Sequence, residues 1–155
     1  LAVYHEFRAT LQQELGMALV MISHDLGLAA SFADEVVVMY AGRAVEQAPT
    51  RELFAHVRMP YTKALLDAIP RVERPPHTPL PVVAGRPPDL AALPAGCPFA
   101  PRCPQAQELC RESAPPLEEG SPGHRWACWF PCEDAAPPST LAPGARPPGG
   151  KTRWA

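Results

Sequence analysis

The sequence has no long hydrophobic run. The longest uninterrupted apolar run near its start, Met17 to Ile22, is far shorter than the roughly 18 residues that a membrane-spanning helix requires. The first 15 residues carry Glu6, Arg8 and Glu14, which argues against the apolar centre of a signal peptide there. These features predict a cytosolic chain that reaches a membrane only through a protein partner.

The sequence also has no excess of either charge. Its net charge is -2, and neither acidic nor basic residues form a block. A nucleic-acid surface requires a cluster of basic side chains. We therefore expect no nucleic acid as a partner.

What the sequence does have is proline, and its distribution is uneven. Of the 22 prolines, 20 lie at or after Pro70, together with 7 of the 10 glycines. Proline removes backbone donors and interrupts helices and sheets. This split predicts a packed half up to about Ile69, a proline-rich spacer from Arg71 to Leu93, and a loop-rich remainder.

A strand, helix, strand unit is predicted over residues 17–40. The apolar runs Met17 to Ile22 and Val36 to Tyr40 are typical of strands that are buried on both faces of a parallel sheet. Asp25 is a suitable N-cap for the helix between them. His24 then lies at the carboxyl end of the first strand, where open α/β sheets bind ligands.

The pattern predicts four further elements. Phe7, Leu11 and Leu15 form one face of a helix over residues 4–15, which Gly16 would end. The Ala-Gly-Arg turn at 41–43 predicts a β-hairpin. A short helix follows Pro49, and a longer one runs from about Pro60 to Ile69.

Two parts of the chain resemble the ATP-binding subunits of ABC transporters. The Ile-Ser-His-Asp stretch at 22–25 and the segment 33–43 resemble the end of the nucleotide-binding domain. The segment 60–70, Gly-Cys-Pro-Phe at 96–99 and Pro-Arg-Cys at 101–103 resemble the C-terminal extension of the oligopeptide and dipeptide subgroup. The chain departs from that pattern at Met59, where the family usually has histidine.

This resemblance, which covers about residues 10–131, implies an α/β fold in three parts. Residues 1–58 would be the C-terminal portion of an ABC-type nucleotide-binding domain, which has the P-loop NTPase fold. Residues 59–132 would form a small Cys-rich, proline-rich extension. Residues 133–155 are expected to be a disordered tail, because they are rich in proline, glycine and small residues.

The resemblance also implies a role for His24. It would be the switch histidine, which bonds the γ-phosphate of ATP and helps to position the attacking water, and is thus both catalytic and cofactor-binding. The phosphate loop, the Ser-Gly-Gly-Gln signature and the acidic strand end are not found in the sequence. We therefore expect the chain by itself not to hydrolyse ATP. Without the family, a lone histidine at a strand end indicates a structural or solvated residue.

A second constellation is four cysteines within 32 residues, at Cys97, Cys103, Cys110 and Cys128. In a cytosolic chain, a bound metal or cluster is favoured over disulfides as the crosslink that stabilises such a segment. The spacing matches neither a zinc ribbon nor a ferredoxin run. The family resemblance favours a [4Fe-4S] cluster, with zinc or no metal as alternatives. Cys132 is an alternative to Cys128, and His124 is a weaker candidate ligand.

These observations favour one function and leave two others open. The first is part of the ATP-binding subunit of an oligopeptide/dipeptide importer, which binds ATP. Its partners would be a second ATP-binding subunit and the transporter's membrane subunits, at the cytoplasmic face of the inner membrane. The alternatives are a stand-alone Fe-S or zinc module with a regulatory or redox role, and an inactive gene fragment.

Overall fold

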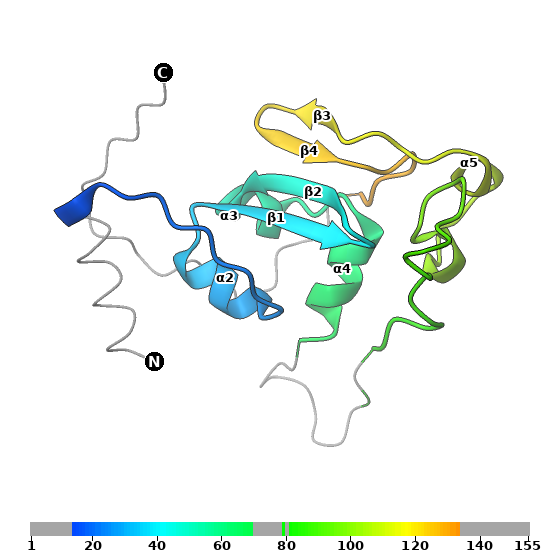
Figure 1. Cartoon of the computed structure of the whole chain (residues 1–155), viewed down its shortest axis with the longest axis horizontal. Coiled ribbons are helices and arrows are strands. Elements are labelled where there is room, and N and C mark those ends of the chain that lie inside the picture. Colours follow the sequence, from blue (N-terminus) through cyan, green and yellow to red (C-terminus); the bar gives the residue numbers. More distant parts are fainter. Residues whose placement is uncertain (1–13, 70–78, 80, 134–155) are drawn as a thin grey trace.

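The chain forms a four-stranded antiparallel sheet in the order β1-β2-β4-β3. The computed structural model describes residues 14–69, 79 and 81–133. The strands are β1 (Glu35–Tyr40), β2 (Arg43–Pro49), β3 (Glu118–Ser121) and β4 (His124–Trp126). Figure 1 shows two hairpins side by side, one from the first third of the chain and one from nearer its end. The sheet thus joins the two halves that the proline distribution distinguishes.

The first hairpin confirms the predicted turn. Ala41 and Gly42 both adopt positive φ, at 50° and 75°, and Tyr40 pairs with Arg43 across the turn. Two consecutive left-handed residues form the turn type whose twist matches that of paired strands, and glycine makes the second position inexpensive. A bulge between Val38 and Met39 shifts the register along β1.

The second hairpin returns the tail to the first. Glu46 pairs with Trp126 and Gln47 with Arg125, and the N–H of Ala127 donates to the carbonyl of Val45 at 2.9 Å. These partners are about 80 residues apart in the sequence. The pairing therefore fixes the cysteine-containing tail to the sheet.

Three helices follow the predicted pattern. They are α2 (Leu26–Phe32), α3 (Thr50–Ala55) and α4 (Pro60–Asp67). The Asp25 carboxylate accepts the N–H of Leu28 at 3.1 Å, so Asp25 is the N-cap of α2. Proline is the first residue of α4, where its missing N–H costs little. In Figure 1, α2 and α4 lie below β1, and the β3–β4 hairpin lies above it.

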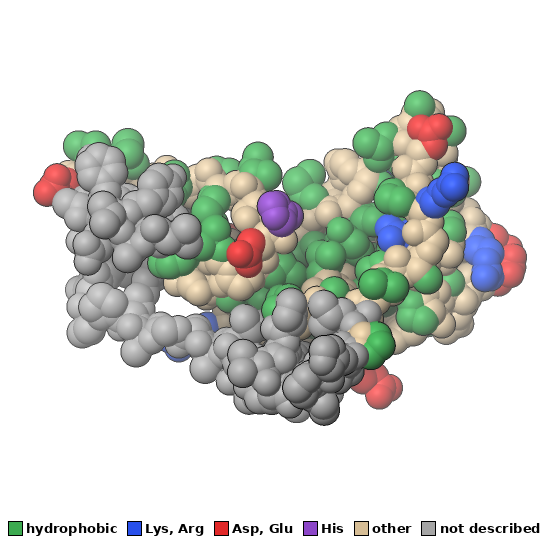
Figure 2. Space-filling view, turned by 90° about the horizontal axis from the view of Figure 1, so that it is seen from below, with side chains coloured by type: hydrophobic (Ala, Val, Ile, Leu, Met, Phe, Trp, Pro, Cys, Tyr) green, Lys and Arg blue, Asp and Glu red, His purple; other side chains and the backbone are tan. Residues whose placement is uncertain are grey.

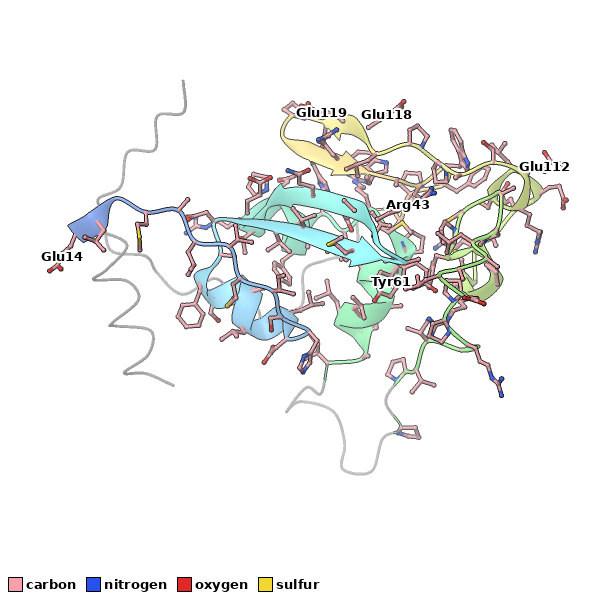
Figure 3. All side chains as sticks on the ribbon, viewed as in Figure 1. Glu14, Arg43, Tyr61, Glu112, Glu118 and Glu119 are labelled. Atoms are coloured by element: carbon pink, nitrogen blue, oxygen red, sulfur yellow. The ribbon has the colours of Figure 1, made fainter. Side chains whose placement is uncertain are left out.

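The core joins the hairpin, α4 and the tail through three aromatic rings. The ring centroid of Tyr40 lies 4.5 Å from that of Tyr61 and 5.3 Å from that of Phe99. The rings of Tyr61 and Phe99 are 5.4 Å apart, in an edge-to-face arrangement. Tyr61 lies near the turn end of the β1–β2 hairpin (Figure 3). Such tilted contacts add to the stabilisation that comes from burial alone.

The tail has two short helices, η1 (Ala100–Arg102) and α5 (Glu108–Glu112). Arg102 fixes η1 to the preceding spacer, because its guanidinium donates to the carbonyls of Val83 and Ala84 at 3.0 and 2.9 Å. The same group donates to the Tyr40 hydroxyl at 3.3 Å. In residues 79 and 81–93, the described part of the spacer, the backbone forms no helix or strand, as predicted.

The predicted parallel strand, helix, strand unit is wrong for the structure of this chain. Met17 to Ile22 forms no strand, and Val20 and Ile22 are 88% and 96% exposed. A strand of a parallel sheet needs a neighbour, and no described segment pairs with this run. β1 pairs antiparallel with β2 and is buried on one face only, since Val37 and Met39 are 49% and 59% exposed.

Other predictions fall largely outside the described residues. Of the helix predicted for residues 4–15, only Glu14 and Leu15 are described; both are helical, and Gly16 follows with a φ of 61°. The tail from residue 134 onward also lies outside them. No helix among the described residues is both long and apolar enough to cross a membrane.

Candidate functional site

The four predicted ligand cysteines line one small cavity beside the core. Its volume is about 20 Å³, or room for about one water-sized sphere. The other lining residues are apolar. The complete lining consists of Met59, Pro60, Cys97, Phe99, Ala100, Cys103, Cys110, Pro115, Cys128 and Trp129.

Backbone contacts bring the cysteine segments together. The N–H of Cys97 donates to the carbonyl of Cys110 at 2.8 Å, and Cys103 directly follows η1. Gly96 makes the first contact possible, because a Cβ at this position would collide with the carbonyls of Cys110 and Arg111. The order of the two short helices therefore places three cysteines around the cavity, and the segment after β4 adds Cys128.

Burial raises the pKa of three of the four cavity thiols, those of Cys97, Cys103 and Cys128. It raises the pKa of Cys128 to about 12, and the neighbouring cysteines add to the effect while a hydrogen bond from the backbone of Phe130 opposes it. Burial also raises the pKa of Cys97 and Cys103, again against opposing backbone hydrogen bonds. At neutral pH these three side chains are therefore protonated thiols. Binding of a metal would therefore have to release their protons.

The donor chemistry of the cavity fits a thiolate-bound group, but its geometry is not that of a closed metal site. Among residues 14–69, 79 and 81–133, no three His, Cys, Asp or Glu side chains are grouped as they would be around a metal ion. A single ion would require the sulfurs to move inward, and a multi-atom cluster would require a larger cavity. Binding of either would thus require the cysteine loops to adjust.

The two alternative ligands do not line the cavity. Cys132 is buried, and its N–H donates to the carbonyl of Arg58 at 2.8 Å. His124 is fully buried on β4, where it contacts Glu46 instead. The cavity therefore groups Cys97, Cys103, Cys110 and Cys128, whereas Cys132 and His124 lie outside its lining.

A buried carboxylate–imidazole pair was not predicted from the sequence. Nε2 of His124 lies 2.9 Å from Oε1 of Glu46, and neither side chain exposes any surface. Glu46 also accepts the N–H groups of Arg58 and Met59, at 2.6 and 3.2 Å. One carboxylate therefore joins β2, β4 and the loop before α4. A charged residue between the apolar Val45 and Ala48 was the only sequence signal.

His24 lies apart from the thiol cavity. It is exposed at a bend just before α2, next to residues that shape the helix start. The N–H of Asp25 donates to Oγ of Ser23 at 3.0 Å, and Asp25 caps the helix. His24 therefore follows an exposed segment without regular secondary structure instead of the predicted sheet strand.

Comparison with known proteins points to one family. Residues 45–110 match the family model described as the oligopeptide/dipeptide transporter, C-terminal region. The chain is 48% identical over 124 residues to the oligopeptide transport ATP-binding protein OppD of Escherichia coli. These residues cover 80% of this chain and 36% of that protein.

Two further relatives agree with this result. OppD of Mycobacterium tuberculosis is 47% identical over 113 residues, which cover 73% of this chain and 18% of that protein. The dipeptide transport ATP-binding protein DppF of Haemophilus influenzae is 44% identical over 119 residues, or 77% of this chain and 36% of that protein. The chain thus spans about a third or less of the length of these curated relatives.

Proposed function

Because the chain belongs to the family of oligopeptide/dipeptide transporter ATP-binding subunits, of which it has the C-terminal region, we propose that it acts as part of such a subunit. In this role it helps to couple ATP binding and hydrolysis to the import of peptides. The observation that carries the proposal is the 48% identity over 124 residues to a protein named for oligopeptide transport.

The proposed partners are a second ATP-binding subunit and the membrane subunits of the importer, which would hold the protein at the cytoplasmic face of the inner membrane. In this proposal, residues 1–58 form the end of the P-loop NTPase fold, and residues 59–132 form the Cys-rich extension.

Exposed apolar side chains support the proposal that further strands of an ABC domain lie beside this chain. Val20 and Ile22 are almost fully exposed, and Met17 and Met39 are each more than half exposed. Figure 2 shows hydrophobic side chains gathered across one face of the molecule, with few charged groups among them. Burying them would contribute about 25 cal/mol per Å² of apolar surface.

His24 is the proposed switch residue for ATP. Its exposure leaves the imidazole accessible to a phosphate group. Imidazole can accept or donate a hydrogen bond near neutral pH, which suits contact with a γ-phosphate and a water. The phosphate loop that binds the β- and γ-phosphates would come from the remainder of the subunit.

Cys97, Cys103, Cys110 and Cys128 are the proposed ligands of a [4Fe-4S] cluster, with zinc as the alternative. Their shared cavity and the lack of any oxygen ligand in its lining support a group that prefers thiolates. A cluster supplies electron transfer, and zinc supplies only a structural crosslink. In either case these four residues would fasten the segments of the tail to one another.

A chimeric subunit tests the transport function. This chain would replace the matching 124 residues of the Escherichia coli relative, in a strain whose growth depends on oligopeptide uptake. We expect growth to be restored, and His24→Ala to abolish ATP hydrolysis by the purified transporter. His56→Ala is the matched control, since it removes a partly buried imidazole elsewhere. A stable chimera that assembles but does not import would contradict the proposal.

Metal content tests the ligand assignment separately. The full chain would be produced without oxygen, and iron, sulfide and zinc would be measured per chain. We expect the bound metal to be lost in Cys103→Ser and retained in Cys132→Ser, because Cys132 does not line the cavity. A folded chain with no metal would refute the assignment and leave the transport proposal unaffected.

A further inference from the structure

The thiol cavity has an inner and an outer wall. On the inner side Met59 and Phe99 are each 1% exposed, so this wall belongs to the core. On the outer side Pro115 and Trp129 are only partly buried. Cys97, Cys103 and Cys128 are partly exposed as well, so the cavity is not sealed from solvent.

A hydrogen bond fixes the indole of Trp129. Its Nε1–H donates to the carbonyl of Ser113 at 3.0 Å. Ser113 is the C-cap of α5, and its own N–H donates to the carbonyl of Leu109 at 3.0 Å. The indole is thus held by the end of the helix that carries Cys110.

This bond closes a ring of segments around the cavity. Trp129 directly follows Cys128, whereas Ser113 lies three residues after Cys110. The backbone bond from Cys97 to Cys110 holds the other side of α5. The segments of three cysteines are thus connected through α5, and the connection on the solvent side is the one through Trp129.

We propose that Trp129 is a cover over the four-cysteine cavity, and that its hydrogen bond to Ser113 holds the cover closed. The cover determines how fast solvent, oxygen and electrophiles reach the four thiols. It would also protect the metal or cluster proposed above, and this second consequence rests on the proposed function. Accessibility of the thiols does not rest on it.

The test is the alkylation rate of each cysteine in the full chain, freed of metal and kept reduced under native conditions. Labelling would be followed by mass spectrometry with fragmentation, so that each cysteine is read separately. Trp129→Phe keeps an aromatic ring and removes the donor, whereas Trp129→Ala removes the cover. Trp126→Phe is the matched control, because Trp126 packs against His124 and Arg58 and does not line the cavity.

We expect Trp129→Phe to raise the labelling rates of the four cavity cysteines about two- to tenfold, which is the range for loss of one hydrogen bond. Trp129→Ala should raise them further. Cys132 is an internal reference, since it is buried outside the cavity, and its rate should not change. The proposal is overturned if the four rates do not rise, if Cys132 rises with them, or if Trp126→Phe has the same effect.

A second measurement separates this inference from the cofactor proposal. The loss of absorbance or metal in air would be compared between the wild-type chain and Trp129→Phe. If no variant binds metal but the labelling rates rise as expected, the cover stands and the cofactor proposal fails. If metal binds and neither labelling nor loss in air depends on Trp129, the cover is refuted and the cofactor proposal stands.

Discussion

Nε2 of His124 lies 2.9 Å from Oε1 of Glu46, and both side chains are fully buried. The same carboxylate accepts two backbone N–H groups from the loop before α4. This single contact connects residues 78 positions apart in the sequence. It also lies beside the loop whose Met59 forms part of the thiol cavity.

Loss of this pair should destabilise the whole chain. Glu46→Ala leaves two N–H groups and an imidazole buried without their acceptor, so we expect the free energy of unfolding to fall by about 3–5 kcal/mol. The double variant Glu46→Ala/His124→Ala should lose less free energy of unfolding than the sum of the losses in the two single variants. Urea unfolding of the two single variants and the double variant gives the coupling energy.

Glu118→Ala, on an exposed site of β3, is the control, with an expected change within about 0.5 kcal/mol. Equal losses in the control and in Glu46→Ala would contradict this role.

The stability of the metal-free chain should decrease at alkaline pH. The pKa of Cys128 is raised from 9.0 to about 12, and those of Cys97 and Cys103 are also raised. Above pH 9 the unfolded chain ionises these thiols while the folded chain keeps them protonated. The contribution of these protonated thiols to the free energy of unfolding is therefore complete below pH 9 and is lost as the pH rises towards 12. Urea midpoints across this range would measure it, and Cys128→Ser should show a shallower decline than the wild-type chain. A decline of the same slope in both would refute the assignment to Cys128.

The start of α2 should depend on the Asp25 carboxylate. Asp25→Ala removes the acceptor of the Leu28 N–H and should cost about 1 kcal/mol of stability. Asp25→Asn keeps a side-chain oxygen and should cost much less. Helical circular dichroism and urea unfolding would measure both. Equal losses in the two variants would show that the negative charge, not the hydrogen bond, is what matters.

Gly96 should control the assembly of the cysteine cavity. Gly96→Ala places a methyl group against the carbonyls of Cys110 and Arg111, so the hydrogen bond from Cys97 to Cys110 should break. We expect faster amide exchange at Cys97 and faster alkylation of the cavity thiols. Ala95→Gly is the neighbouring control, on an exposed residue. Unchanged exchange at Cys97 in Gly96→Ala would contradict the steric argument.

The segment Met17 to Ile22 shows where prediction from sequence fails in this chain. Its apolar run predicts a buried strand, but the structure leaves it exposed and pairs it with none of the segments that are described. The number of apolar residues in a run does not reveal which segment will pair with it. The candidate site shows the same limit, since the sequence indicates the four cysteines but not the cavity that they share with Met59 and Phe99.

By itself, the sequence determined the local elements. Asp25 sets the start of α2, the Ala41-Gly42 pair sets the hairpin turn, and Pro60 sets the start of α4, because each acts on backbone groups within a few residues of itself. Only the tertiary structure decided the antiparallel pairing of β2 with β4, the burial of Glu46 against His124, and the place of Trp129 in the lining of the thiol cavity. These contacts join distant segments. They depend on the combined packing of many side chains, which no short stretch of sequence contains.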